Sequence, residues 1–245
     1  MKSVVIFKWA VKPEDIRVKI DGSIDWSAAP PWVGDDDYVA AQVACQAAGP
    51  EGEVVGLTLA DGDVAFAAAR GAGYTVALEN TPLPASVLCL ARTLAAAVRD
   101  IGDVGVVTVG DSDWEPALPS FLAGLLGWPA LMAVDSVAAT DGALRVTRRF
   151  AAYTQEVTVA GPVLLGVQAR REEKDKPGLK AVLTARKKPV KILKADELGG
   201  FEAEPSLISL GSSLPETAPA RLISGAEPER AVGELLQALR NEGVL

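Results

Sequence analysis

Histidine is absent from the 245-residue sequence, and cysteine is nearly so. Histidine is the commonest general base near neutral pH and the commonest metal ligand, so its absence excludes the usual form of both chemistries. The two cysteines, Cys45 and Cys89, are far apart and lack the close spacing of a redox or metal motif, so we expect buried thiols that pack as small apolar groups. Binding, or chemistry carried by a cofactor, is therefore a better expectation than catalysis by the chain's own side chains.

Positive charge and long apolar runs are also scarce. The formal net charge is -8, which argues against a nucleic-acid partner because such a partner requires a broad basic face. The sequence has no run of the roughly 20 apolar residues that a membrane span needs, and its apolar start at residues 4–7 is too short for the core of a signal peptide. We therefore expect a cytoplasmic protein. What is present, with 49% hydrophobic and 23% charged residues, is ordinary for a globular domain.

Short apolar runs alternate with helix-like segments over roughly the first 130 residues. The expected strands are 3–7, 53–59, 74–78 and 104–109. The expected helices are 35–48, 64–72, 85–99 and 118–126. Strand-then-helix alternation predicts an α/β fold with a doubly wound, mainly parallel, Rossmann-like sheet.

The pattern changes beyond this point. Further strands are expected at 131–136, 144–151, 156–160 and 163–167, with a hairpin signal at Asp141-Gly142 that predicts added antiparallel strands. The highly charged segment 170–189 reads as a loop, residues 199–219 as an extended connector, and 230–242 as an amphipathic helix. We expect an α/β nucleotide-binding-type domain over 1–198 and a C-terminal helical arm over 199–245, which either contacts a partner subunit or packs back on its own domain.

Several segments resemble the small, or beta, subunit of electron transfer flavoproteins. The most specific is 177–189, PGLKAVLTARKKP, which resembles a signature of the family. Residues 121–129, FLAGLLGWP, are similar to the helix that follows the family's nucleotide loop. The opening strand with Phe7-Lys8-Trp9, and the C-terminal segment from Pro219, also resemble the family.

The resemblance implies a subunit that works beside an alpha subunit, which holds most of the site for a redox-active FAD. The heterodimer would dock flavin-dependent dehydrogenases for electron transfer, so this chain would be an electron carrier subunit rather than a self-contained enzyme. The family's beta subunit also holds a second nucleotide, AMP in ordinary members and a second FAD in bifurcating members. Two alternatives stay open: a bifurcating subunit whose second FAD oxidises NADH, and a free-standing adenine-nucleotide-binding sensor.

The positions that match the family's nucleotide pocket lie at strand ends and in the loops that follow them. They are Ile6, Gly34, Asp35, Leu59, Gly110, Asp111, Trp114 and Leu118. Apolar members such as Leu59 are equally explained as core residues at a strand end. Trp114 could stack on an adenine or flavin ring, or fill the pocket itself.

The loop after residue 110 departs from the family's phosphate-binding pattern. Two of its residues are prolines, which lack the N–H group that a phosphate would accept. Three others are acids, which place negative charge where a phosphate would lie. These residues are Pro116, Pro119, Asp111, Asp113 and Glu115. The sequence therefore argues against AMP at this site, and more strongly against a second FAD.

Leu179 stands among charged residues, at the position where the family carries the leucine that anchors a partner dehydrogenase. A hydrophobic anchor with Lys180 beside it would enter a pocket while the charge steers the approach; alternatively, Leu179 folds under its own loop. Arg149 is a further docking candidate, because the family usually has an acid near this position that helps to hold the flavin domain. Alternatively, Arg148 and Arg149 are exposed on an edge strand and oppose aggregation.

Two acidic runs, at residues 35–37 and 61–63, offer oxygen ligands for a cation. Both lie where a helix N-terminus favours acids, and we interpret them as helix-capping residues. We predict neither a metal site nor a catalytic side chain.

Overall fold

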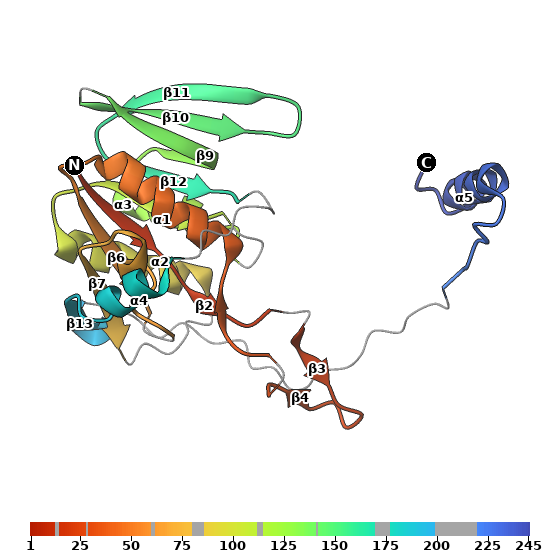
Figure 1. Cartoon of the computed structure of the whole chain (residues 1–245), viewed down its shortest axis with the longest axis horizontal. Helices are drawn as coiled ribbons and strands as arrows, with labels where there is room; N and C mark the ends of the chain where they lie inside the picture. Colours follow the sequence, from red (N-terminus) through yellow and green to blue (C-terminus); the bar gives the residue numbers. More distant parts are fainter. Residues whose placement is uncertain are drawn as a thin grey trace. The chain divides into compact units, whose positions relative to one another are not determined.

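The computed structural model describes residues 1–12, 15–27, 29–59, 62–79, 86–111, 115–140, 142–169, 177–198 and 220–245 (Figure 1). The chain forms two units. The larger consists of Met1–Arg17 with Ile24–Leu210, and the smaller of Val18–Ser23 with Gly211–Leu245. The predicted boundary after residue 198 stays a prediction.

Among the described residues, a nine-stranded sheet forms the centre of the larger unit, in the order β11-β10-β9-β12-β8-β1-β6-β7-β13. Neighbours from β9 to β13 in this order pair in parallel, whereas β9, β10 and β11 pair antiparallel. The strands are β1 (Lys2–Ile6), β6 (Glu53–Thr58), β7 (Tyr74–Glu79), β8 (Val104–Gly110), β9 (Ala130–Thr140), β10 (Ala143–Arg149), β11 (Thr154–Ala160), β12 (Val163–Val167) and β13 (Val190–Lys194). The predicted α/β, Rossmann-like sheet with antiparallel additions is confirmed.

Helices connect and cover these strands. They are α1 (Asp35–Ala48), α2 (Val87–Ile101), α3 (Leu118–Leu126) and α4 (Leu179–Ala185), with α5 (Pro228–Asn241) in the smaller unit. Two 3-10 helices, η2 (Ala68–Arg70) and η3 (Ala195–Leu198), and four two-residue strands, β2 (Trp9–Ala10), β3 (Arg17–Val18), β4 (Ile24–Asp25) and β5 (Trp32–Val33), complete the described elements. No helix in the described ranges is long and apolar enough to cross a membrane.

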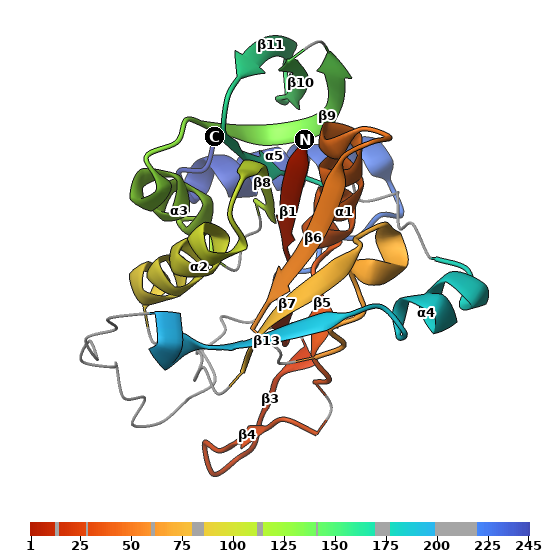
Figure 2. The same ribbon diagram turned by 90° about the vertical axis from the view of Figure 1, so that its left-hand side faces the viewer.

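Both faces of the central strands are buried, which is why these strands are mainly apolar. Along β1, Val5 and Phe7 belong to the core on the α1 side, whereas Val4 and Ile6 belong to the core under α2 and α3. Figure 2 shows α2 and α3 on one side of the central strands and α1 on the other. The two faces together bury the side chains that a two-residue alternation of β1 places on opposite sides.

Helix α1 lies directly on β1 and β8. The hydroxyl of Ser3 donates to the carbonyl oxygen of Ala44 at 2.8 Å, and the hydroxyl of Thr108 donates to that of Ala40 at 3.0 Å. Both hydroxyls are buried, so these bonds satisfy polar groups that would otherwise be costly in the core. They hold the middle and later turns of α1 against β1 and β8.

The prediction of an α-helix over 64–72 is wrong. The described part of this segment consists of turns followed by η2. Phe66 packs against the rings of Phe7 and Tyr38, each at a centroid distance of 5.1 Å. The ring contacts of Phe66 hold this segment close to the sheet. The chain turns again at Gly71, whose φ is 120°, so too few residues lie between the two for a full α-helix.

The charged segment 170–189, expected to be a loop, contains α4, and β13 follows it without a sequence-based prediction. Residues 170–176 lie outside the described part of the chain, as do residues 199–219 of the expected connector. Helix α4 contacts η2 through Ala185, which is buried against Ala65 and Ala68. Helix α4 has only seven residues and lies among charged ones, so its sequence shows almost no amphipathic pattern. The contact with η2 that stabilises it is a tertiary one, which the local sequence does not reveal.

Candidate functional site

The carboxyl ends of β1 and β8 form the natural ligand site of this fold. From β1 the chain proceeds to β6 and β7 on one side, and then returns to β8 on the other side of β1. Such a reversal opens a crevice at the carboxyl ends of the two strands, where doubly wound proteins bind ligands. A cavity of about 300 Å³ lies at this place, lined by residues that end or follow β1, β6 and β8.

The cavity walls are mainly apolar. Four of the residues predicted from the sequence line it, namely Ile6, Leu59, Gly110 and Leu118, and the indoles of Trp9 and Trp26 contribute to the same wall. Of the described lining residues, three carry ionisable side chains: Lys8, Asp37 and Glu115. The residues predicted to form the nucleotide pocket include none of these three, although the sequence places Glu115 in the loop where a phosphate would lie.

Three other predicted residues lie next to the cavity or outside it. Gly34 and Asp35 form the start of α1 but are not among the described lining residues. Asp111 follows β8, and its carboxylate accepts a hydrogen bond from the N–H group of Ala133 at 3.4 Å. Trp114 lies outside the described residues, so its two predicted roles stay predictions.

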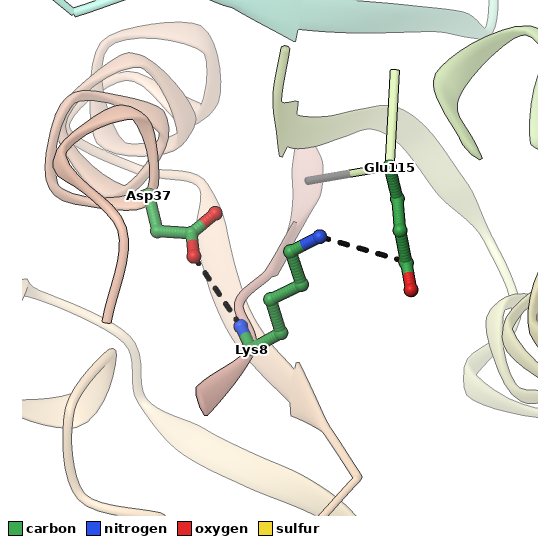
Figure 3. A network of polar contacts seen from close by, with 3 residues as sticks. All are labelled: Lys8, Asp37 and Glu115. Atoms are coloured by element: carbon green, nitrogen blue, oxygen red, sulfur yellow. Dashed lines mark hydrogen bonds and ion pairs between the residues drawn. The ribbon is translucent and has the colours of Figure 1, made fainter. Parts of the chain in front are cut away.

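Asp37 is the most deeply buried ionisable side chain at the cavity, with a relative exposure of 4%. Its carboxylate accepts a hydrogen bond from the backbone N–H of Lys8 at 3.4 Å (Figure 3). Burial raises the pKa of Asp37 to about 7, although the hydrogen bond and charge of Lys8 and a hydrogen bond from the backbone of Gly110 oppose this rise. The nearby charge of Asp36 adds to it.

Gly110 makes the approach of α1 to β8 possible. A Cβ atom at this position would lie 2.7 Å from Oδ1 of Asp37 and 2.9 Å from Cβ of Asp36. Both distances are shorter than side chains tolerate without movement. The glycine therefore serves close packing of a helix start against a strand end, which is one of the physical reasons for glycine beside a site.

Lys8 connects two acids from different elements. Its backbone binds Asp37, while its ammonium group lies 3.5 Å from the carboxylate of Glu115 (Figure 3). The side chains of Lys8 and Glu115 are 22% and 30% exposed, so the pair lies at the mouth of the cavity. The arrangement places an acid beside the ammonium group and neutralises the charge of the lysine.

The first acidic run does not act as a set of capping side chains. Gly34 is the N-cap of α1, without a side-chain cap hydrogen bond. Instead Asp36 accepts from the N–H of Ala169 at 2.7 Å, and Asp37 binds Lys8. The acids lie in the first turn of α1, as the helix-terminus interpretation expects, and Asp36 and Asp37 also bind backbone groups of other segments. Part of the second run, Asp61, lies outside the described residues.

No group of three or more metal-ligating side chains occurs among the residues that the structure describes. Cys45 and Cys89 are both partly buried and free of disulfides. Cys45 donates to the carbonyl oxygen of Arg70 at 3.2 Å, and burial raises the pKa of its thiol. A raised pKa disfavours the reactive thiolate, in agreement with the expected packing role.

The predicted docking residue Leu179 begins α4 and is 76% exposed. The alternative in which it folds under its own loop is therefore wrong. Lys180 is also exposed, and Leu183, one helical turn further, is 53% exposed. Residues 186–188, Arg-Lys-Lys, form a basic run. The ammonium group of Lys188 donates to the carbonyl oxygens of Ala68 and Ala72.

The arginines of β10 are held by the antiparallel strands. Strand β10 lies between β9 and β11, so the interpretation of Arg148 and Arg149 as edge-strand residues is wrong. Arg149 forms an ion pair of 3.4 Å with Asp135. Arg148 donates to the carbonyl oxygen of Met132 at 2.7 Å and to the side-chain oxygen of Gln155 at 2.9 Å.

Helix α5, every residue of which is described, buries none of them. It is nevertheless amphipathic, with apolar residues that recur at helical spacing. Val232, Leu235 and Leu236 are exposed by 56%, 48% and 39%. Contiguous exposed apolar side chains on a helix are typical of an interaction surface.

The fold and the cavity define an α/β, Rossmann-like protein with its ligand crevice at the carboxyl edge of a parallel sheet. The sequence of residues 37–198 matches the protein-family model of the electron transfer flavoprotein domain. The chain therefore belongs to the electron transfer flavoprotein family, whose members are flavin-associated electron carriers, and the resemblance seen in the sequence is confirmed at the level of the family.

Proposed function

We propose that the chain is the beta subunit of a heterodimeric electron transfer flavoprotein. In this proposal an alpha subunit holds most of the site for the redox-active FAD, and this chain supports that flavin and docks flavin-dependent dehydrogenases. The exposed apolar face of α5 carries the proposal. A helix of 14 residues is marginal by itself in water, so one with no buried residue needs a surface to cover its apolar side.

The chemistry of the cavity supports a carrier subunit rather than a self-contained enzyme. Its described ionisable groups are engaged with one another, as Lys8 binds both Asp37 and Glu115. Histidine is absent from the chain, and the thiol of Cys45 is held as a thiol by burial. Electron transfer then depends on a flavin and its position, which the protein supports.

Two surfaces serve different partners in this proposal. Residues 199–245 form the arm toward the alpha subunit, and residues 1–198 the α/β domain. Leu179 and Lys180 dock the dehydrogenase, an exposed apolar anchor beside a positive charge. Arg149 faces the flavin-carrying subunit, although its ion pair with Asp135 would have to be kept or exchanged on binding.

The test is the flavin content of the tagged chain, purified from cells that also express the flavoprotein subunit encoded with it. The expected result is one partner chain and one FAD for each copy of this chain. Replacement of Leu235 and Leu236 by Asp should remove the partner and its FAD together, while the Gln237→Ala control on the same helix should retain both. A chain that keeps one FAD by itself, without a partner, would overturn the proposal.

A further inference from the structure

The cavity at the ends of β1 and β8 lies where the family resemblance places a second nucleotide, either AMP or a second FAD. Both ligands carry phosphate. A phosphate at such an edge is held by backbone N–H groups that have no other acceptor and by cationic side chains. The described residues of this chain supply little of either.

The N–H groups at the strand ends already have acceptors within the chain. The N–H of Lys8, after β1, donates to the carboxylate of Asp37 at 3.4 Å. The N–H of Asp111, after β8, donates to the carbonyl oxygen of Val167 at 2.7 Å. Acceptors within the chain thus take hydrogen bonds that a bound phosphate would otherwise accept.

The start of α3 also lacks a phosphate cradle. The N–H of Leu118, its first residue, donates to the carbonyl oxygen of Glu115 at 3.0 Å. The next residue is Pro119, which has no N–H group. The N–H of Phe121 donates to the carbonyl oxygen of Ala117 at 3.0 Å. The first turn of the helix therefore offers few donors to an anion.

The charges that line the cavity also disfavour a bound phosphate. Of the described residues that line the cavity, only Lys8 is basic, and its ammonium group is 3.5 Å from the carboxylate of Glu115. Asp37 adds a second acid to the same wall. A phosphate entering here would meet the carboxylate of Glu115 and one lysine that this carboxylate already neutralises, and repulsion between like charges grows as water is displaced.

We infer that this cavity excludes phosphate-bearing nucleotides, because the Asp37 carboxylate accepts the N–H of Lys8, Val167 accepts that of Asp111, and Glu115 neutralises the only lysine among the described lining residues. The apolar and indole wall that remains fits an uncharged ring better than a nucleotide. The inference concerns this chain's own cavity and does not rest on the partner subunit, so it can fail while the proposed function holds.

The test compares adenosine with AMP, which differ by the phosphate, in calorimetric titrations of the full chain. Wild-type protein should bind AMP at least about fivefold more weakly than adenosine. Glu115→Gln should release the Lys8 ammonium group and tighten AMP by about fivefold or more, with little change for adenosine. Glu156→Gln, which removes an exposed acid of β11, is the matched control and should change neither ligand.

Several outcomes would overturn the inference. AMP retained through purification, or bound by the wild-type chain as tightly as adenosine, would do so. If the wild-type chain binds neither ligand, a gain of AMP binding in Glu115→Gln still supports the inference. An affinity for AMP that is no tighter in Glu115→Gln than in the wild type overturns it, whether both proteins bind AMP or neither does.

Discussion

The backbone N–H of Lys8 donates a hydrogen bond of 3.4 Å to the carboxylate of Asp37 (Figure 3). This bond connects the segment after β1 to the first turn of α1. The ammonium group of Lys8 forms an ion pair with Glu115, in the segment before α3. Because Ser3 and Thr108 also hold α1 to β1 and β8, the elements around the cavity are connected at several points. The cavity edge is therefore part of the folded core.

Asp37 should make stability depend on pH. Its pKa rises from 3.8 to about 7 on folding, so the folded state binds a proton that the unfolded chain releases at lower pH. The stabilising contribution of this group is fully present below about pH 4 and is lost as the pH rises through about 7. As the pH is raised from about 5 to about 8, the unfolding free energy of Asp37→Asn should therefore increase by about 2–3 kcal/mol relative to that of the wild type.

The measurement is urea denaturation of both proteins across this pH range. A constant offset from the altered hydrogen bonds is expected and does not matter, because only the slope with pH is compared. Glu156→Gln, an exposed acid on β11, is the control. Parallel pH profiles for wild type and Asp37→Asn would show that the buried carboxyl does not titrate in this range.

Gly110 should tolerate no side chain. Alanine there would bring a Cβ atom to 2.7 Å from Asp37 and 2.9 Å from Asp36, and α1 would have to move away from β8. We expect Gly110→Ala to destabilise the fold by about 1–3 kcal/mol, the usual cost of overpacking. Gly105→Ala, in the same strand, meets its nearest atom at 3.4 Å and should cost much less in the same denaturation experiment. Equal losses would show that the effect belongs to the strand and not to the contact.

The parallel part of the fold can be predicted from the sequence because its signals are local. Helix α1 spans Asp35–Ala48, as the first-turn acids and the following Gly49 indicate. Strand β12 likewise coincides with the apolar run 163–167. Helix α4 and strand β13 are not predictable in this way, since α4 is stabilised by contact with η2 and β13 by pairing with β7.

The cavity shows the same division. Ile6, Leu59 and Gly110 can be placed there from the sequence because they end or follow parallel strands. Asp37 cannot, because an acid in a first helical turn also satisfies the helix dipole from the surface. What turns it inward is the close approach of α1 to Gly110, a tertiary feature. The signal that could have identified it is the glycine at the strand end, read together with the acidic helix start.

Lys188 should contribute to stability where its neighbour does not. Its ammonium group donates to the carbonyl oxygens of Ala68 at 3.0 Å and Ala72 at 2.7 Å, and so satisfies backbone acceptors at the start of η2 and just after it. Lys188→Ala leaves these oxygens without the charged donor and should cost about 1–3 kcal/mol in urea denaturation. Lys187→Ala, at an exposed position next to it, should change the unfolding free energy by less than about 0.5 kcal/mol. A similar cost for both would mean that the basic run acts through its total charge.

Leu179 should matter for docking and not for folding. It is 76% exposed, so Leu179→Ala removes almost no buried surface and should leave the unfolding free energy unchanged. As an anchor in a partner's pocket it should lower kcat/KM for electron transfer with the dehydrogenase by about tenfold or more. Ile192→Ala is the control, because Ile192 on β13 is likewise an exposed aliphatic residue, at 58%. Steady-state kinetics with the reconstituted flavoprotein distinguishes the two, and an equal loss in both variants would assign docking to general apolar exposure rather than to the start of α4.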